Sequence, residues 1–509
     1  MVNIYLDGVE MTPEIVLGPP GTGKTTRLLG MVEDELASGT APDRIGYVSF
    51  TKQASNEAIS RACEKFDLSK RDLRYFRTLH SMCFNVLGLS NSDVFEGKKM
   101  AEFGEWIGEP LTATKRMDDT TLFGFTRGDR AMFMENLARV KQVPLYNLYR
   151  DDDDDMDWIF VERMSKALRQ YKKDQHLIDY TDMLERFADT HYVPKLDVLF
   201  VDEAQDLSML QWGVVNRLAK SCHRLVIAGD DDQAIYRWAG AAVEHFVDLG
   251  GNVTVLGKSW RVPKSIQRVA SRVIKKVIHR RDKQWSPRED DGVVNRLQSI
   301  EELDLSSDDI MILARNAFVL KDAEELLKSE GIIYTIRGQS SVKQDTLDAV
   351  KLWEALRAGK TLLADEARTV YQHMSSGIGV QRGYKTLAGF SPDHPVTIDD
   401  LKQKGGLLRG DIWHDALDRI PQAERVYLLR ALRRGESLTA RPRVRLSTIH
   451  GSKGGEADHV VILTDMARRT YNEMSLTPED EARVWYVAVT RAREQLSIVA
   501  PSSRMYYDL

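Results

Sequence analysis

The sequence predicts an α/β protein in which parallel sheets alternate with long helical segments. A strand, a glycine-rich loop and a helix follow one another within residues 15–36, and apolar runs at residues 196–201 and 224–228 are typical of strands buried on both faces. Residues 89–177 and 341–442 instead carry apolar side chains at helical spacing. We therefore expect two sheet domains, each with a mainly helical insertion.

The composition is that of a soluble protein with several domains. A chain of 509 residues exceeds the roughly 250–300 residues at which a single core usually stops growing. Hydrophobic residues make up 42% and charged residues 29%; no apolar run approaches the roughly 18 residues of a membrane span, and no signal peptide is visible. The three scattered cysteines fit a reducing cytoplasm. With a net charge of −5, any nucleic-acid surface must be a local groove.

The stretch IVLGPPGTGKTT fits the P-loop pattern in its full context of strand, loop and helix. Glycines let successive backbone N–H groups point into one concavity, and the following helix end adds positive potential, so a polyphosphate can bind there. We expect Lys24 to reach the β- and γ-phosphates of ATP and the Thr25 hydroxyl to bind Mg²⁺. The alternative is a glycine turn with a solvated lysine. The predicted loop comprises Gly18, Pro19, Pro20, Gly21, Thr22, Gly23, Lys24, Thr25 and Thr26.

Polar side chains follow two later predicted strands. The run LDVLFV ends in Asp202 and Glu203, where a P-loop protein holds Mg²⁺ and the attacking water. We expect Asp202 to bind the metal and Glu203 to orient or deprotonate the water; an acidic cap on the next helix is the alternative. The run RLVIA leads into GDDDQAIYRW, in which the amide of Gln233 is suited to sensing a γ-phosphate.

Aromatic and imidazole side chains also occur at strand ends. Phe50 and His80 follow predicted strands, and Tyr236 and Trp238 lie close behind Gln233. Stacking on unpaired bases contributes about 1–3 kcal/mol per base without reading sequence, although plain core packing is the alternative for each. A segment that joins phosphate sensing to strand binding is what a motor requires.

Taken in order, the motifs resemble those of the UvrD/Rep/PcrA-type superfamily 1 DNA helicases. The first five are GPPGTGKT, YVSFTKQAS, TLHS, VDEAQD and GDDDQAIYRWAGA. The second half of the chain continues the series with KSWR, LSTIHGSKGGEAD and YVAVTRAR. The resemblance extends from Gly18 to Arg493.

The resemblance implies roles for the matched residues. Trp260 would stack on adenine, Arg261 would touch the γ-phosphate, Glu456 would contact the ribose, and Arg491 would be an arginine finger, worth about 10³–10⁵ in rate. An interdomain salt bridge is the alternative for both arginines. The implied catalytic residues are Lys24, Glu203, Gln233, Arg261 and Arg491. The implied DNA contacts are Phe50, Thr51, His80, Tyr236, Trp238, Thr448 and His450.

The resemblance also implies two RecA-like P-loop NTPase domains with an ATP cleft between them and single-stranded DNA crossing both. We expect domain 1A at residues 1–88 and 178–257, insertion 1B at 89–177, domain 2A at 258–340 and 443–509, and insertion 2B at 341–442. The expected ligands are ATP, Mg²⁺, single-stranded DNA and single-/double-strand junctions. A monomer in the cytoplasm of a bacterium or a phage-infected host, with replication or repair partners, would fit this reading.

Two features of insertion 2B carry weaker predictions. Gly377 and Gly379 lie in SGIGV, which resembles the glycine turn of a helix–hairpin–helix, where amides approach a duplex phosphate; a plain helix–helix turn explains it equally well. An arginine-rich stretch near the return to the sheet is either a DNA backbone contact or a solvated face. It contains Arg430, Arg433, Arg434, Arg441, Arg443 and Arg445.

The match has departures that bear on function. We find no adenine-reading glutamine ahead of the P-loop, and Trp238 is followed by Ala239 where an arginine is usual. The main hypothesis is an ATP-dependent helicase that translocates 3′→5′ on single-stranded DNA. The alternatives are a translocase that strips proteins or joint molecules with little unwinding, a nucleotide-switched binding protein, and an RNA substrate.

Overall fold

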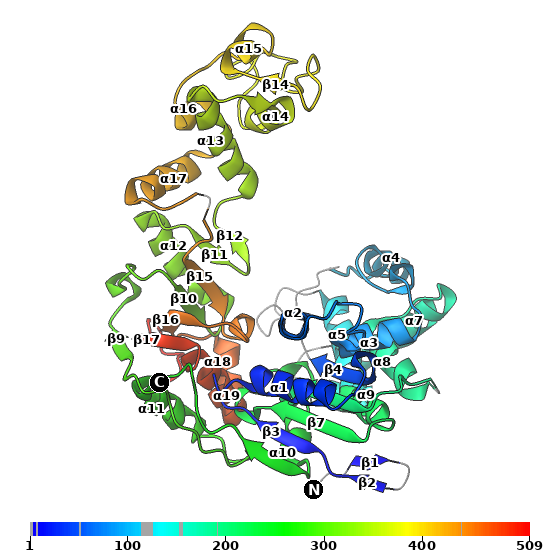
Figure 1. Cartoon of the computed structure of the whole chain (residues 1–509). Helices are drawn as coiled ribbons and strands as arrows, with labels where there is room; N and C mark the ends of the chain where they lie inside the picture. The colour runs from blue at the N-terminus through cyan, green and yellow to red at the C-terminus, as the bar shows by residue number, and fades with distance from the viewer. Residues whose placement is uncertain are drawn as a thin grey trace.

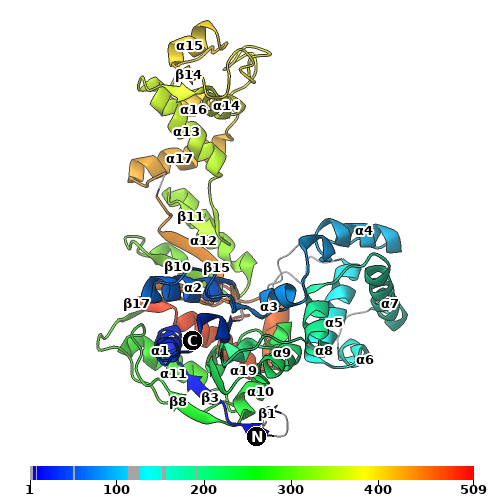
Figure 2. The same cartoon turned by 45° about the vertical axis from the view of Figure 1, so that its right-hand side comes forward.

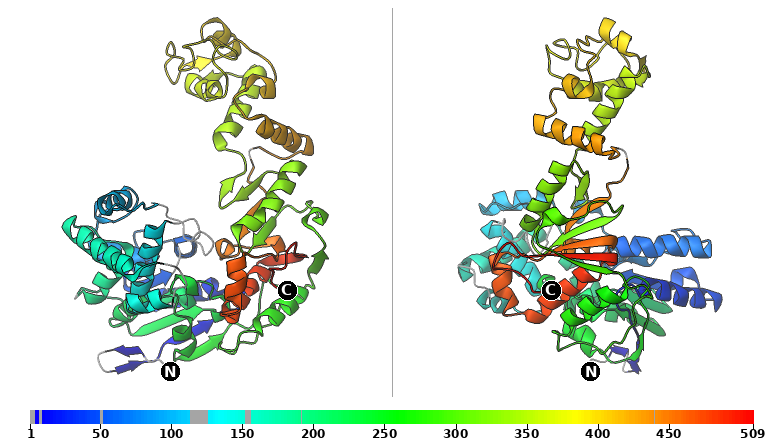
Figure 3. Two further views of the ribbon diagram at one scale, coloured as in Figure 1. Left: turned by 180° about the vertical axis from the view of Figure 1, so that it is seen from behind. Right: turned by 90° about the vertical axis from the view of Figure 1, so that its left-hand side faces the viewer.

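The computed structural model describes residues 4–6, 9–49, 52–112, 126–151, 156–190, 192–438 and 440–509. Two sheets, each built mainly or wholly of parallel strands, lie next to each other with helices around them (Figure 1). A helical segment lies beside the first sheet, and a second one extends away from the other sheet (Figures 1 and 3). The predicted α/β class is confirmed.

The first sheet has six parallel strands in the order β5-β4-β6-β7-β3-β8. It confirms the strands predicted around the glycine loop and at residues 44–50, 196–201 and 224–228, whereas β8, a largely exposed edge strand, is not foreseen. The strands are β3 (Glu14–Leu17), β4 (Ile45–Ser49), β5 (Phe76–Thr78), β6 (Val198–Asp202), β7 (Arg224–Gly229) and β8 (Asn252–Val255). A hairpin of β1 (Ile4–Leu6) and β2 (Val9–Met11) precedes them.

Helices cover both faces of this sheet. Alternation along β3 sends Ile15 and Leu17 into the core on one face and Val16 into the core on the other. The second of these cores is closed by α1 (Lys24–Ala37) and α2 (Lys52–Phe66). The first is closed by α3 (Leu79–Val86), α8 (Tyr180–Asp189), α9 (Met209–Ala219) and α10 (Val243–Asp248).

The described part of residues 89–177 is helical, as predicted. Its helices surround a separate apolar core that contains Phe103, Met134, Phe160 and Leu168. They are α4 (Lys98–Ile107), α5 (Arg127–Lys141), α6 (Leu145–Arg150) and α7 (Trp158–Asp174).

The second sheet has seven strands in the order β12-β11-β15-β10-β16-β17-β9, and within it only β12 pairs antiparallel. The strands predicted at residues 309–315 and 331–337 are confirmed as β10 and β11. The strands are β9 (Val293–Leu297), β10 (Ile310–Ala314), β11 (Tyr334–Ile336), β12 (Gln339–Ser340), β15 (Val444–Thr448), β16 (Ala457–Leu463) and β17 (Ala492–Val499). The accompanying helices are α11 (Lys264–Ile274), α12 (Leu320–Glu330), α18 (Arg468–Met474) and α19 (Pro478–Val489).

The distal helical segment, residues 342–436, extends away from both sheets, and its α17 (Gln422–Arg434) lies nearest to them, against α12 (Figure 2). Its own core includes Trp353, Tyr371 and Trp413, and it holds one short strand pair, β13 (Leu362–Leu363) with β14 (Pro395–Val396). Its helices are α13 (Gln344–Arg357), α14 (Ala364–Gln372), α15 (Ile398–Gln403), α16 (Trp413–Ala416) and α17 (Gln422–Arg434). Among the described residues, none of the helices combines the length and the apolar character needed to cross a bilayer.

One prediction for this segment needs correction. The helix–hairpin–helix turn is wrong, because α14 is followed by irregular chain rather than a second helix, and the amides of Gly377 and Gly379 donate within the turn to Val380 and Ser375 at 2.6 and 2.9 Å. The arginine-rich stretch stays a prediction: four of its arginines, Arg430, Arg433, Arg434 and Arg441, are exposed, and several of the six also have partners inside the chain. Its intramolecular contacts are Arg430 with the Ser329 carbonyl, Arg434 with Glu330, Arg443 with Glu436, and Arg445 with Asp309.

Candidate active site

A cleft of about 780 Å³ lies where the two sheets face each other. On one side it is lined by the ends of first-sheet strands, which meet at one edge because the strands are parallel. The other side comes from the second half of the chain. The lining includes the glycine loop from Gly18 to Thr26, Asp202, Glu203, Gln233, Trp260, Arg261, Glu456 and Arg491.

The glycine loop has the backbone form that the pattern predicts. Gly21 and Gly23 have φ of +70° and +79°, in the left-handed region that favours glycine. A Cβ on Gly21 would lie 2.3 Å from the Cβ of Arg261, so this position also needs glycine because another segment approaches it. The Ser259 hydroxyl donates to the Pro20 carbonyl at 2.7 Å, and the Trp260 amide donates to the Gly21 carbonyl at 2.8 Å. The segment at residues 259–261 is thus bound directly to the loop.

Lys24 starts α1 and points to the acidic side of the cleft. Its ammonium lies 3.0 Å from an oxygen of Glu203. Burial opposes the lysine charge, but Glu203, Asp202 and Asp230 together outweigh burial and raise the pKa of Lys24. The lysine is therefore charged. The Glu203 carboxylate holds it in the cleft, where its ammonium could turn to a bound phosphate.

Asp202 and Glu203 lie at the end of β6 in opposite electrostatic settings. Asp202 accepts hydrogen bonds from the Tyr47 hydroxyl at 2.8 Å and the Glu203 amide at 2.9 Å, and burial with the adjacent Glu203 charge raises its pKa to about 6. Burial acts on Glu203 too, but Lys24, Lys453 and Gln205 outweigh it and lower the Glu203 pKa to about 2. Glu203 also has φ of +56°, a strained backbone of the kind that clusters at functional sites.

Two residues of the cleft, one in α1 and one at the end of β6, fit a magnesium ion. The Thr25 hydroxyl and the Asp202 carboxylate are hard oxygen donors, the type Mg²⁺ prefers, and both line the cleft. The raised pKa of Asp202 indicates a buried carboxylate whose surroundings leave its charge undercompensated, as expected for a cation ligand.

The predicted phosphate-sensing amide and arginine finger are in direct contact. The Arg491 guanidinium donates to the Gln233 side-chain oxygen at 2.8 Å, and the Gln233 side-chain nitrogen donates to Asp230 at 2.6 Å. Arg491 is buried, and burial together with neighbouring Arg261 lowers its pKa to about 9. Arg261 pairs with Glu456 at 2.5 Å. The structure therefore brings residues of six separate motifs into one cleft.

Lys453 and Asp206 are cleft residues that the sequence reasoning missed. The Lys453 ammonium lies 2.5 Å from an Asp206 oxygen and donates to the Gln233 carbonyl at 2.8 Å. It also lies 4.9 Å from the ring centre of Tyr236. A lysine in the glycine-rich stretch GSKGGE after a strand was the available signal, by the same logic as for the P-loop. Arg288, Arg445 and Arg493 also line the cleft.

The predicted DNA-contact residues fall into four groups, of which His80 is described below. Tyr236, Trp238 and His450 lie together: the Tyr236 hydroxyl donates to the His450 carbonyl at 3.3 Å, and Trp238 is edge-to-face with His450 at 6.2 Å. Thr448 is buried and accepts from the Gly451 amide at 3.2 Å, which places it inside a turn. Phe50 and Thr51 lie outside the described residues.

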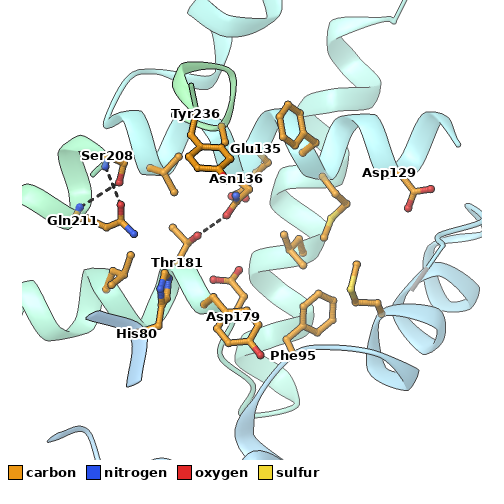
Figure 4. Close-up of a pocket in the computed structure, with 18 of the residues that line it drawn as sticks. His80, Phe95, Asp129, Glu135, Asn136, Asp179, Thr181, Ser208, Gln211 and Tyr236 are labelled. Carbon is orange, nitrogen blue, oxygen red and sulfur yellow. Dashed lines mark hydrogen bonds between the residues drawn. The ribbon is translucent and has the colours of Figure 1, made fainter. Parts of the chain in front are cut away.

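His80 and Tyr236 line a second cavity, of about 370 Å³, between helices of the insertion and the loops that follow β6 and β7 (Figure 4). Burial lowers the pKa of His80 to about 4, so its ring is neutral, and it packs edge-to-face on Tyr180 at 5.9 Å. Across the cavity Thr181 donates to Asn136 at 2.5 Å.

The adenine-stacking residue predicted for the first cleft, Trp260, is 70% exposed, so its ring is open to a flat ligand.

Comparisons with known proteins give matches over most of the chain. Residues 8–253 match the UvrD/REP helicase N-terminal domain, and residues 423–503 match the UvrD-like helicase C-terminal domain. The chain is 25% identical to the ATP-dependent DNA helicase PcrA of Bacillus subtilis (strain 168) over 365 residues, which cover 64% of this chain and 48% of PcrA. It is 23% identical to the "Putative ATP-dependent DNA helicase YjcD" of the same organism over 590 residues, covering 97% of this chain and 77% of YjcD. The match thus spans about half the length of PcrA.

Proposed function

The chain belongs to the UvrD/REP helicase family, and we propose that it hydrolyses ATP to move along single-stranded DNA and unwind duplex DNA in the 3′→5′ direction. The observation that carries the proposal is the single cleft that contains Lys24, Glu203, Gln233 and Arg491. These side chains come from both halves of the chain. The direction and the unwinding step are extended from the family.

The cleft residues divide the chemistry between them. The loop amides and Lys24 bind the β- and γ-phosphates, and Glu203 takes a proton from the attacking water. Arg261 and Arg491 stabilise the charge that develops on the transferring phosphoryl group. A bound Mg²⁺, held by Thr25 and Asp202, would supply charge neutralisation at the phosphate oxygens.

Contacts between residues of the cleft lining connect its reaction centre to the proposed DNA-binding side chains. Gln233 lies three residues before Tyr236 in the same loop. The Lys453 ammonium contacts both of them, the Gln233 carbonyl and the Tyr236 ring. Tyr236 in turn contacts His450 from the second half of the chain. A change in the position of Gln233 therefore reaches the aromatic side chains that would hold bases.

Steady-state ATP hydrolysis with and without a single-stranded oligonucleotide tests the proposal. We expect stimulation well above a few-fold at low salt, and a smaller effect would count heavily against a DNA motor. Duplexes with 3′ and 5′ tails, compared side by side, test direction: unwinding of the 3′-tailed duplex alone is expected. Strong stimulation with displacement of a bound protein but without unwinding would favour a protein-stripping translocase instead.

A further inference from the structure

A fully buried lysine, Lys283, occupies the centre of three aspartates. Its side chain is 0% exposed, and its ammonium lies 2.9 Å from Asp230, 2.5 Å from Asp231 and 3.2 Å from Asp232. The oxygens of the three aspartates lie within 4.8 Å of one another. Such a group could hold a metal ion, but here the ammonium already supplies the positive charge.

The contact joins the two halves of the molecule. The aspartates follow β7 of the first sheet, whereas Lys283 lies between α11 and β9 of the second half. Arg280, from the same segment as Lys283, pairs with Asp232, and Arg483 of α19 donates to the Asp231 carbonyl at 2.9 Å. Burial disfavours the charge of Lys283, but the three carboxylates outweigh it and raise the lysine pKa.

Asp230 connects this cluster to both sides of the proposed reaction centre. Its carboxylate accepts from the Gln233 side chain at 2.6 Å, and Gln233 accepts from Arg491 at 2.8 Å. Its backbone amide donates to Gln205 at 3.0 Å, and Gln205 donates to Glu203 at 2.6 Å. Lys283 itself does not line the cleft.

We propose that Lys283 is a positioning residue for ATP hydrolysis: it fixes the Asp230 carboxylate, which fixes the Gln233 amide, which holds Arg491 in place. The inference rests on the proposed ATPase function. Without the ammonium, three close carboxylates repel one another. Asp230 then keeps only the Asp232 amide, at 3.2 Å, and Gln233 itself as donors, so its carboxylate holds Gln233 less firmly. The substrate site itself stays intact, so binding and turnover should separate.

The first test compares full-length wild type with Lys283→Met in steady-state ATPase assays with saturating single-stranded DNA. We expect kcat to fall about ten- to a hundredfold, the scale of a small misplacement near a reaction centre, with KM for ATP unchanged within about twofold. Lys172→Met is the matched control. Lys172 is also buried and pairs with Asp179 and Asp182, away from the cleft, so it should lose thermal stability but keep kcat.

Two further variants keep the test decisive if Lys283→Met does not fold. Lys283→Met with Asp231→Asn removes one charge of each sign but leaves Asp230 without the Lys283 ammonium, so kcat should remain at least about tenfold below that of Asp231→Asn alone. In a Gln233→Ala background, Lys283→Met should lower kcat by less than about twofold, because residues that act through one another are not additive.

Folded Lys283 variants with undiminished kcat, or a loss of kcat that persists in full without Gln233, would overturn the assignment. A comparable loss in Lys172→Met would also overturn it, because general destabilisation would then explain both. Wild-type protein that fails to hydrolyse ATP would refute the proposed function together with this assignment. Hydrolysis by the wild type beside an unaffected variant would refute the assignment alone.

Discussion

Adjacent residues in the cleft have opposite electrostatic behaviour. The pKa of Asp202 is raised to about 6, whereas the pKa of its neighbour Glu203 is lowered to about 2. Neighbouring carboxyl groups whose pKa values are driven apart are a common sign of divided roles. Here the division matches a metal ligand and a residue that acts on water.

We expect Glu203→Gln to abolish turnover while ATP still binds. Loss of a general base usually costs about 10²–10⁴ in rate, whereas the loop amides that hold the phosphates are untouched. Single-turnover hydrolysis and equilibrium ATP binding, measured on the same preparation, check the loss of turnover and the retention of binding. Hydrolysis close to the wild-type rate would remove Glu203 from the assigned role.

Asp202 gives a prediction about stability and pH. Because its pKa is raised from the usual 3.8 to about 6, the folded state binds more protons than the unfolded state between these values, and its contribution to stability rises as pH falls. We expect Asp202→Asn to melt above wild type at pH 8, with the difference shrinking as pH drops through about 6. Thermal melts without nucleotide across this range would show it.

Asp197→Asn is the control of opposite sign. The hydrogen bond from Arg44 lowers the pKa of Asp197, so removing this carboxylate should not raise the melting temperature at pH 8. A melting difference for Asp202→Asn that does not change with pH would contradict the electrostatic explanation.

At the scale of elements, the loop after β7 is the meeting point of three parts of the chain. Trp238 stacks on Phe133 of α5 at 6.4 Å and lies edge-to-face with His450, just after β15, at 6.2 Å. Arg237, its neighbour, pairs with Asp480 of α19 at 3.0 Å. The loop therefore touches a helical insertion and the second sheet domain as well as its own sheet.

Trp238→Ala should weaken coupling to DNA more than basal hydrolysis. Removing the ring deletes a stacking surface, worth about 1–3 kcal/mol per base, but leaves Lys24 and Glu203 in place. ATPase activity titrated with single-stranded DNA separates the two effects, and Trp106→Ala, at an exposed tryptophan of α4, is the control. Equal losses of basal and stimulated activity would assign Trp238 a structural role.

The sequence predicts elements well where a local pattern of residues is sufficient to specify the element. The buried strands β4, β6, β7 and β10 are largely continuous apolar runs, and the glycines of the P-loop follow a spacing that is typical of a phosphate-binding turn. By contrast, β16 and β17 contain short runs, VVIL and LSIV, that suit a strand or a buried helix equally.

Other features depend on contacts that no local pattern carries. Lys453 and Lys283 acquire their partners from segments more than 50 residues away. The glycine pattern at Gly377 and Gly379 led to the wrong prediction of a helix–hairpin–helix, since a turn-like sequence does not show whether a helix follows it. Long-range packing, rather than propensity, decides these cases.

At the scale of the molecule, the distal helical segment is separate from the cleft. It has its own apolar core, and no described residue between 342 and 436 lines the cleft. The Tyr427 hydroxyl donates to the Ile332 carbonyl at 2.5 Å, one contact that ties the segment to the second sheet domain.

Replacing residues 342–436 by a short glycine–serine linker should therefore leave DNA-stimulated hydrolysis within about threefold of wild type, because a segment with its own core contributes little to a distant site. Circular dichroism and thermal melts would first establish that the shortened chain folds. Complete loss of hydrolysis in a folded protein would show that the distal segment acts on the cleft.

The contact between Lys24 and Glu203 has a consequence for the timing of the proposed ATP hydrolysis. A glutamate with a pKa near 2 is a weak proton acceptor. Burial alone would raise this pKa, and the charge of Lys24 is the largest of the influences that lower it. Once a triphosphate attracts that lysine, the carboxylate loses its nearest positive neighbour and becomes more basic. Binding of a triphosphate would thus make Glu203 a better base at the moment when the proposed reaction needs one.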